Sequence, residues 1–503
     1  MKHQLGEMLN WDDLAAVTTG PFEVELDSIA REKVSRGQQA LQKVLVSGRT
    51  VYGINTGFGL LAEKRISNED LVQLQTNLVL SHACGTGPAL EDRVVRLVML
   101  LKIKSLSHGY SGVRLTLIER LVAMLNADAL PIVPSQGSVG ASGDLAPLAH
   151  LTAAVIGEGE ISLGGKRLSA REALKQLRME PFQLGPKEGL ALLNGTQVST
   201  ALAVTGLLAT QDAFSAAVVA GALSVDAAMG SDAPFDPRIH ALRPHAGQRD
   251  CAAAYRELLA GSAIRASHVD CSRVQDPYSL RCQPQVMGAV LDHLRFVGQQ
   301  ILCECNSVTD NPLLFPDTGD SLSGGNFHAE PIALAADSLA VAIAEIGSLS
   351  ERRIALLIDR HLSGLPPFLV ENGGLNSGFM IAQVTAAALV SENKCLAHPA
   401  SVDNIPTSAN QEDHVSMATH AARRTIDMAR NTATVVAIEM LAAAQGIDFR
   451  RPLKTSSRLQ VVHNRIRETV PFYDRDRYFA PDIKRMLDLV ESGWLRSHAA
   501  IEF

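Results

Sequence analysis

The sequence predicts a mainly α-helical protein in which long helices pack side by side as a bundle. Aromatic residues make up only 4% of the 503 residues, so aliphatic and alanine side chains must fill the core, as they do between closely packed helices. Residues 407–445 contain no proline or glycine, and a helix of that length normally packs lengthwise against others. After Pro331, apolar residues recur at heptad-like spacing. Together these observations favour a helical class.

The first part of the chain mixes short strands with amphipathic helices. Residues 22–27 alternate like a strand, and residues 161–168, with two glycines at their centre, are typical of a small hairpin. Apolar residues at helical spacing predict helices over residues 94–106 and 115–125. We therefore predict a mixed, mostly helical N-terminal domain over residues 1–195.

The second part, residues 196–503, carries the long helices. One helix is expected to begin near Pro331, because proline fits the first helical turn. Residues 407–445 are expected to form a single helix that ends at Gly446 as its C-cap. The predicted architecture is a long-helix bundle followed by a C-terminal helical region.

Composition and charge exclude several classes of protein. The chain has 46 Lys and Arg against 53 Asp and Glu, a net charge of −7, and no long basic run, so no nucleic-acid partner is expected. Acidic residues interrupt the N-terminal stretch that a signal peptide would need. The seven scattered cysteines lack a C-x-x-C pair, and no histidines have metal-ligand spacing. We expect a cytoplasmic protein without a metal site.

Two stretches without charged residues, 189–211 and 372–391, raise the question of a membrane span. Each contains several Asn, Gln, Ser or Thr residues, which would be costly in hydrocarbon. We expect both to be buried segments of the bundle, and no association with a membrane.

The most glycine-rich loop, residues 135–147, points to the chemistry. Asp144, followed by Leu-Ala-Pro, has the pattern of an N-cap, so residues 141–143 should lie at the positive end of a helix. Ser142 beside Asp144 or His150 could serve as the nucleophile of a hydrolase, although the loop lacks the G-x-S-x-G pattern. A serine hydrolase is therefore one hypothesis.

Six sequence blocks resemble those of the aromatic amino acid ammonia-lyase family, in the family's order. The clearest is Gly-Ala-Ser-Gly-Asp-Leu-Ala-Pro-Leu, at residues 140–148. The others are Tyr-Gly-Ile-Asn-Thr-Gly-Phe-Gly (52–59), Asn-Gly-Thr (194–196), Gln-Asp-Pro-Tyr-Ser-Leu-Arg (275–281), Gly-Gly-Asn-Phe-His-Ala-Glu (324–330) and Gln-Glu-Asp (411–413). The resemblance implies an aspartase/fumarase-like fold, a carbon–nitrogen lyase activity and a homotetramer whose sites are shared between subunits.

The resemblance also implies a prosthetic group made from the chain itself. In the family, the residues that match Ala141, Ser142 and Gly143 cyclise to 4-methylidene-imidazol-5-one, an electrophile that no ordinary side chain supplies. Each residue type suits this reaction: Gly143 has no Cβ to obstruct its amide nitrogen, Ser142 loses its hydroxyl as water, and Ala141 is small. No diffusible cofactor is expected.

Further roles follow from the resemblance, residue by residue. Tyr278 would remove the β-proton of the substrate, and Tyr52 would be a second catalytic tyrosine. Arg281, three residues after Tyr278, would share its helix face and bind the substrate carboxylate. A phenol has an ordinary pKa of about 10, so Tyr278 needs positive charge nearby. The other expected contacts to the prosthetic group or substrate are Asn194, Gln275 and Phe327.

His82 and Glu412 bear on the choice of substrate. The block around His82 resembles that of histidine-specific members, and Glu412 could pair with an imidazole nitrogen, whereas a carboxylate against a phenyl ring would be costly. We expect L-histidine as the substrate and trans-urocanate and ammonia as the products, the first step of histidine degradation. Cys84 and Thr86, in the same block, depart from the family pattern.

Two other hypotheses stay open beside the hydrolase. A tyrosine ammonia-lyase or aminomutase of the same family would act on L-tyrosine instead of L-histidine. A non-catalytic helical scaffold would carry no electrophile, and Ser142→Ala would then affect only its stability.

Overall fold

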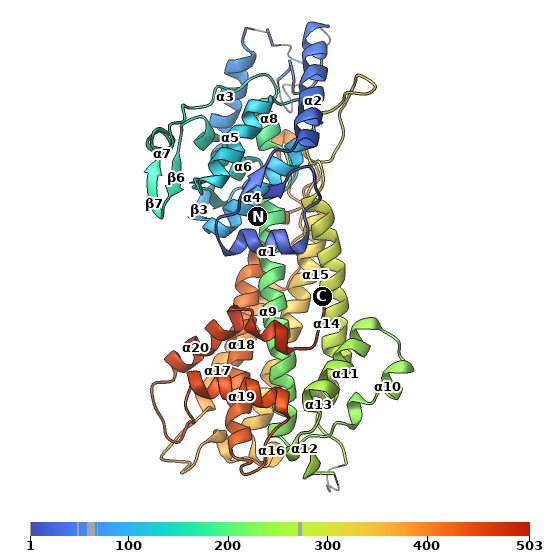
Figure 1. The fold of residues 1–503 in the computed structure, drawn as a ribbon, viewed down its shortest axis with the longest axis vertical. Helices are drawn as coiled ribbons and strands as arrows, with labels where there is room; N and C mark the ends of the chain where they lie inside the picture. Colours follow the sequence, from blue (N-terminus) through green and yellow to red (C-terminus); the bar gives the residue numbers. More distant parts are fainter. Residues whose placement is uncertain (1, 48–49, 58–65, 68, 270–273) are drawn as a thin grey trace. The chain divides into compact units, whose positions relative to one another are not determined.

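The computed structural model describes residues 2–47, 50–57, 66–67, 69–269 and 274–503 and is mainly helical (Figure 1). The chain divides into two compact units. The first comprises Met1–Thr205, Gln299–Asp337 and Pro399–Arg423, and the second comprises Gly206–Gly298, Ser338–His398 and Arg424–Phe503. The domain boundary at residue 195 stays a prediction.

The first unit contains the helices that precede the long bundle helices. They are α1 (Trp11–Thr19), α2 (Ser28–Val46), α3 (Leu71–His82), α4 (Asp92–Ser107), α5 (Leu115–Asn126), α6 (Leu145–Val155), α7 (Ala170–Gln176) and α8 (Glu188–Leu193). The helices predicted over residues 94–106 and 115–125 are confirmed by α4 and α5.

The strands of the first unit form four small sheets. These are β1 (His3–Gln4) parallel to β2 (Val24–Glu25); β3 (Thr86–Ala89) antiparallel to β5 (Pro134–Gln136); β4 (Leu130–Pro131), β6 (Glu160–Leu163) and β7 (Lys166–Ser169), all antiparallel; and β8 (Leu313–Phe315) antiparallel to β9 (Asp320–Leu322). Gly164 and Gly165, with φ values of 58° and 73°, make the tight turn between β6 and β7. The predicted hairpin is confirmed, and β2 lies within the predicted strand.

Four long helices have residues in both units: α9 (Gln197–Ala227), α14 (Gln283–Cys305), α15 (Glu330–Ile358) and α18 (Ala418–Asp448). Pro331 lies in the first turn of α15, as predicted.

The prediction of one helix over residues 407–445 was wrong at both ends. Ser408, Ala409 and Met417 have φ values of 52°, 53° and 56°, which a right-handed helix does not allow, and α18 begins at Ala418. At the other end, Gly446 lies inside α18, where an added Cβ would be 2.8 Å from the Cβ of Ala227 on α9. Gly446 therefore permits close helix packing and is not a C-cap.

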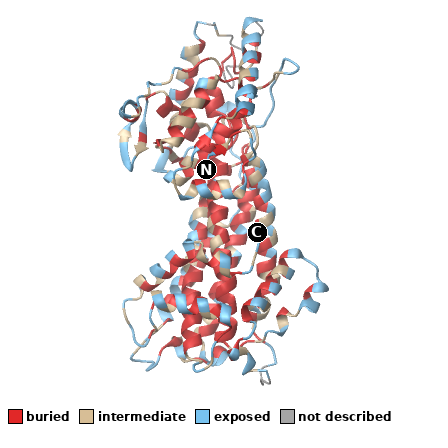
Figure 2. Cartoon of the chain, viewed as in Figure 1, coloured by how far each residue is buried: buried red, intermediate tan, exposed pale blue. Residues whose placement is uncertain are grey.

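In the second unit, parts of the long helices run side by side among shorter ones (Figure 1). Buried residues concentrate on the long helices (Figure 2). At the centre, Arg353 of α15 and Glu439 of α18 form a fully buried ion pair, and Ser224 of α9 donates a hydrogen bond of 2.7 Å to Glu439. These contacts join three helices and compensate the buried charges. The shorter helices are α10 (Pro237–Ala241), α11 (Ala246–Leu259), α12 (Ala263–Ala266), α13 (Tyr278–Arg281), α16 (Arg360–Ser363), α17 (Met380–Leu396), α19 (Ser457–Thr469) and α20 (Ala480–Glu491).

Two long helices, α9 and α15, are long and apolar enough to span a membrane by length and composition. However, 83% and 67% of their most apolar windows are buried inside the protein, as in core helices. The expectation of a buried segment of the bundle over residues 372–391 was wrong, because this stretch forms a loop and part of α17, where Ile381 and Val384 are exposed.

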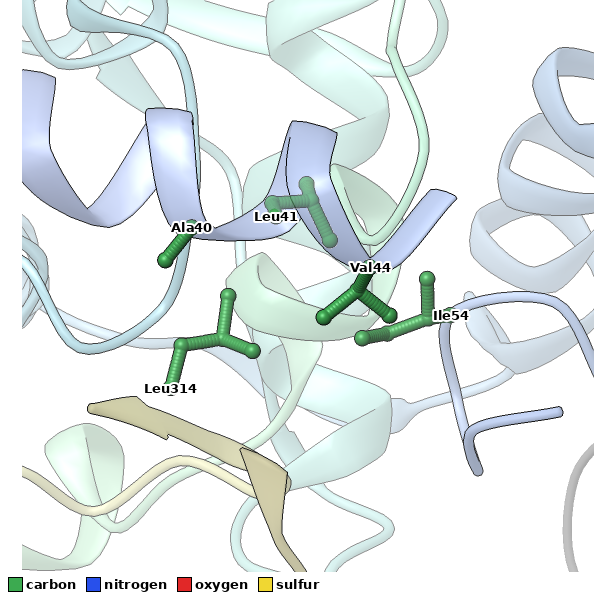
Figure 3. Packing of buried hydrophobic residues seen from close by; sticks show 5 residues of the cluster. All are labelled: Ala40, Leu41, Val44, Ile54 and Leu314. Atoms are coloured by element: carbon green, nitrogen blue, oxygen red, sulfur yellow. The ribbon is translucent and has the colours of Figure 1, made fainter. Parts of the chain in front are cut away.

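A small apolar cluster in the first unit anchors the loop that carries Tyr52. It consists of Ala40, Leu41 and Val44 of α2, Leu314 of β8, and Ile54 (Figure 3). Ile54 is fully buried, whereas Tyr52 is half-buried. The loop is thus held by its apolar residue, and Tyr52 stays partly accessible.

Candidate active site

The Ala141, Ser142 and Gly143 tripeptide lies just before α6, where two backbone segments come very close. Gly143 and Gly195 form an isolated parallel bridge, and the Asp144 amide donates a hydrogen bond of 2.8 Å to the Gly195 carbonyl. Gly143 has a φ of 77°, and an added Cβ would lie 2.3 Å from the Gly195 oxygen. Only glycine fits this position.

Asp144 holds the N-terminus of α9 rather than that of α6. It occupies the N-cap position of α6, as predicted, but its side chain makes no capping hydrogen bond there. One carboxylate oxygen accepts from the Ser199 amide (2.7 Å) and hydroxyl (2.9 Å), in the first turn of α9. The other accepts from the hydroxyls of Ser138 (2.9 Å) and Thr419 (2.6 Å). The fully buried carboxylate therefore joins the tripeptide loop to α9 and α18.

Asn194 contacts the tripeptide directly. Its side-chain amide donates a hydrogen bond of 2.8 Å to the Ser142 carbonyl oxygen. Its other polar atom, Oδ1, is buried and accepts no hydrogen bond from the residues that the structure describes. An unpaired buried acceptor is costly and rare, so it needs an explanation, and a role in binding or catalysis is one.

Glu412 is the hydrogen-bond partner of Ser142. The Ser142 hydroxyl donates to Oε1 of Glu412, and the hydroxyls of Thr407 (2.6 Å) and Ser408 (2.9 Å) donate to Oε2. Burial raises the pKa of the Glu412 carboxyl, but these hydrogen bonds and the charge of nearby His82 outweigh burial and lower it overall. Glu412 is therefore an ionised carboxylate at neutral pH.

The loop that carries Glu412 is tied to the tripeptide loop by its backbone. The amides of Ser416 and Met417 donate hydrogen bonds of 3.2 Å and 2.8 Å to the Val139 carbonyl, and the Ser416 hydroxyl donates to the Gly140 carbonyl at 3.0 Å. These bonds explain why the chain is not yet helical here.

His82 and Phe327 also belong to the first unit. His82 is the last residue of α3, and its Nδ1 atom forms a hydrogen bond of 3.1 Å with the Ser81 hydroxyl. Phe327 is half-buried in the loop before α15, and the amide of Ala329 in this loop donates to the Gly140 carbonyl at 3.1 Å. Both the Phe327 loop and the Glu412 loop are therefore fixed to the residues just before the tripeptide.

The loop of Tyr52 is fitted to α8. An added Cβ at Gly53, which has a φ of 69°, would lie 2.5 Å from a methyl group of Leu190. The block 52–59 is described only as far as residue 57, so its last two residues lie outside the described chain.

Three predicted site residues belong to the second unit. Tyr278 and Arg281 lie on α13, and the Arg281 guanidinium stands over the Tyr278 ring at 4.5 Å, so the two residues share a face as expected. Tyr278 is 71% exposed, and Gln275 is exposed as well. The Arg281 charge therefore lies beside the Tyr278 ring.

The arrangement does not resemble that of a serine hydrolase. The Asp144 carboxylate is occupied by the donors described above, and His150 accepts a hydrogen bond of 3.0 Å from the Gly85 amide. Among the described residues, no hydrogen bond joins Ser142 to Asp144 or His150. A nucleophilic serine needs such a base.

The sequence did not predict one cluster of potential metal ligands. His328, Glu330 and His414 have potential ligand atoms that all lie within 4.8 Å of one another. However, the two imidazole rings are nearly parallel, and His328 Nε2 lies 3.2 Å from the His414 carbonyl oxygen, which suits a hydrogen bond within the protein. The absence of a metal site stays a prediction.

The chain is similar to known proteins over most of its length. The sequence profile described as "Aromatic amino acid lyase" matches residues 9–468. A curated histidine ammonia-lyase of Desulfotalea psychrophila is 61% identical over 481 residues, covering 96% of this chain and 94% of that protein. One of Vibrio cholerae is 60% identical over 484 residues, with coverage of 96% and 95%.

Solved structures show the same fold. The crystal structure of a histidine ammonia-lyase from Trypanosoma cruzi has a TM-score of 0.92 at 40% identity, covering 99% of this chain and 95% of that one. A phenylalanine aminomutase of Pantoea agglomerans has a TM-score of 0.94 at 30% identity and covers both chains fully (100% each). The predicted fold class, a long-helix bundle of the aspartase/fumarase-like type, is confirmed.

We predict that Asp144→Asn destabilises the first unit. An amide has one acceptor oxygen instead of two and directs N–H groups at the donors around it. The free energy of unfolding should fall by about 3 kcal/mol, the size of a buried hydrogen bond to a charged group. This loss should appear as a lower midpoint of thermal unfolding. The exposed Asp320→Asn variant is the control and should change stability by less than about 0.5 kcal/mol. Equal midpoints for both variants would contradict the anchoring role of Asp144.

Proposed function

Because this chain belongs to the aromatic amino acid lyase family, we propose that it is a histidine ammonia-lyase, which converts L-histidine to trans-urocanate and ammonia. The observation that carries the proposal is the hydrogen bond between Ser142 and Glu412, together with nearby His82, which helps to lower the pKa of the Glu412 carboxyl. An ionised carboxylate and an imidazole can pair with both ring nitrogens of a histidine substrate, whereas a phenyl or phenol ring would leave the carboxylate without a partner.

The electrophile is proposed to be 4-methylidene-imidazol-5-one, made from Ala141, Ser142 and Gly143. In its formation, the Gly143 nitrogen bonds to the Ala141 carbonyl carbon, and that carbonyl oxygen leaves as water with the amide hydrogens of Gly143 and Ser142. The Ser142 hydroxyl and Cα hydrogen leave as a second water. The glycine-only position of residue 143 and the Asn194 amide at the Ser142 carbonyl fit this group. When present, the group would supply an electrophile for the substrate to attack, and this attack would make the substrate's amine a better leaving group.

The side chains of the protein then bind the substrate and move its protons. Arg281 binds the carboxylate with two N–H groups, and Gln275 adds a polar contact. Tyr278, beside the Arg281 charge, takes the β-proton, and Tyr52 serves as the second catalytic tyrosine. Glu412 and His82 hold the imidazole ring, and Phe327 provides an apolar wall. Each role is part of the proposal.

We also propose a cytoplasmic homotetramer in which each site combines residues of several chains. The exposure of Tyr278 and Gln275 in the single chain supports this assembly, because residues that bind a substrate are normally enclosed. The six described cysteines are all free, which suits a reducing compartment.

The central test compares the intact mass and the activity of the protein with those of Ser142→Ala. The unaltered chain should be lighter than its sequence by the mass of two water molecules and should convert L-histidine to urocanate, followed by absorbance. Ser142→Ala should have the full sequence mass and no activity, because no hydroxyl can leave. The exposed Ser497→Ala should behave like the unaltered chain.

The alternatives give different results in the same test. A serine hydrolase or a helical scaffold would show the full mass before substitution. A tyrosine lyase or aminomutase would show the reduced mass but would act on L-tyrosine and leave L-histidine unchanged.

The choice of substrate is tested by Glu412→Gln. Loss of the carboxylate should lower kcat/KM for L-histidine by about 10- to 100-fold, the equivalent of one charged hydrogen bond of about 1.5–3 kcal/mol. The exposed Asp403→Asn, in the same loop, is the matched control and should keep kcat/KM within about twofold. Equal kinetics in both variants would remove Glu412 from the substrate site.

Shared sites are tested by mixing two inactive chains. Ser142→Ala lacks the electrophile, and Tyr278→Phe lacks the base, but an oligomer that contains both chains can still form sites with an intact residue at each position. We expect co-expressed and doubly tagged oligomers to recover part of the activity. Mixed oligomers as inactive as their parents, or a fully active monomer, would contradict shared sites.

A further inference from the structure

Two buried lysines of α4 provide a comparison within one helix. Lys102 and Lys104 are only 1% and 2% exposed, and each donates hydrogen bonds to two backbone carbonyls. Lys104 Nζ bonds to the carbonyls of Leu5 (2.9 Å) and Glu7 (2.6 Å), near the N-terminus. Burying a lysine amine is unfavourable, so the hydrogen bonds of each lysine must offset the free-energy cost of its burial.

Lys102 differs from Lys104 in what it holds. Its Nζ donates to the carbonyl oxygens of Asn194 (2.7 Å) and Ala191 (3.1 Å). These groups belong to the last turn of α8 and to its C-cap, where helix carbonyls have no partner within the helix. Lys102 therefore fixes the end of α8.

The residues that follow α8 contact the tripeptide directly. Residues 194–196 connect α8 to α9, and the Asn194 side chain donates to the Ser142 carbonyl at 2.8 Å. The next residue, Gly195, forms the bridge to Gly143 and accepts from the Asp144 amide. A shift of this connection would move the hydrogen-bond donor of Ser142 and the backbone against which Gly143 packs.

The far end of the connection is held separately. The Thr196 hydroxyl donates to Glu304 at 2.6 Å, and the Thr196 amide donates to the Thr309 hydroxyl at 3.3 Å. The hydrogen bonds of Lys102 thus fix the end of the connection next to α8, and those of Thr196 fix the end next to α9.

The hydrogen bonds from Lys102 to the Ala191 and Asn194 carbonyls do not require that Lys102 is charged. Burial is the largest cause that lowers the pKa of Lys102 to about 7; the charge of Lys187 acts in the same direction, and the charges of Asp310 and Asp144 oppose it. An ammonium has three N–H donors and a neutral amine has two, so both carbonyls can be satisfied in either state.

We propose that Lys102 is a positioning residue for the formation and use of the electrophile, acting through the connection at Asn194. This inference rests on the proposed function. Ring formation needs the Gly143 nitrogen close to the Ala141 carbonyl carbon, and Lys102 holds the backbone that keeps these atoms in place. In the part of the chain that the structure describes, the hydrogen bonds of Lys102 go to the carbonyls of Ala191 and Asn194 and not to the tripeptide.

The test compares Lys102→Met with Lys104→Met. Methionine has a similar length and no donor, so each variant loses two hydrogen bonds and one buried amine. Both should lose similar stability, measured by thermal midpoint. Only Lys102→Met should show incomplete loss of the two waters by intact mass, and a kcat lowered by about 100-fold with KM within about twofold. Lys104→Met should be fully cyclised and active.

A double-mutant cycle tests the route of the effect. If Lys102 acts through Asn194, then Lys102→Gln should add little to the loss of cyclisation already caused by Asn194→Ala. Independent, additive losses would overturn the route. Equal cyclisation and kcat in Lys102→Met and Lys104→Met would overturn the proposal.

Two further outcomes are covered by the design. If the Met variants are insoluble, the Lys102→Gln and Lys104→Gln pair, which keeps a polar amide on a side chain one bond shorter, decides the question in the same way. If the unaltered chain itself keeps its full sequence mass, the proposed function fails, and this result is distinct from a difference between the two lysine variants.

Discussion

The close approach of Gly143 and Gly195 is the constraint on which the site depends. These two backbones meet where α6 and α9 begin, so the N-termini of two helices, with their partial positive charge, converge beside the tripeptide. The Asp144 carboxylate accepts an amide of α9 and balances part of this charge. A side chain at residue 143 would separate the two backbones, and Asn194 and Asp144 would then lose their partners.

Buried polar groups hold this meeting point from several directions. Asp144 joins α9 and α18 to the tripeptide loop, Lys102 holds the end of α8, and the Glu412 loop is bonded to the carbonyls that precede the tripeptide. Each group is costly to bury and is stable only because its hydrogen bonds are made. The result is a fixed environment for Ala141, Ser142 and Gly143, as the ring formation proposed for these residues requires.

Local sequence patterns predicted the parts of the fold that depend on local structure. The periodicity of α4 and α5, the paired glycines of the hairpin and Pro331 at the start of α15 all carried their signal within a few residues. The loop at residues 407–417 did not, because its left-handed residues are set by hydrogen bonds to Val139 and Gly140, far away in sequence. Gly446 was misread for the same reason, since the α9 side chain that demands a glycine is distant in sequence.

The site itself shows where sequence reasoning needs a family resemblance. Ser142 and Glu412 are 270 residues apart, and no spacing rule connects them. Lys102 could have been noticed, because it lies among apolar residues on every side of α4, where a charged group must find partners. Its partners at Ala191 and Asn194 could not. The reactivity proposed for the tripeptide depends on such distant contacts, because the same three residues in an isolated peptide would have neither the hydrogen bond from Asn194 nor the close approach of Gly195. The proposed electrophile would in this sense depend on the tertiary structure and not on the local sequence alone.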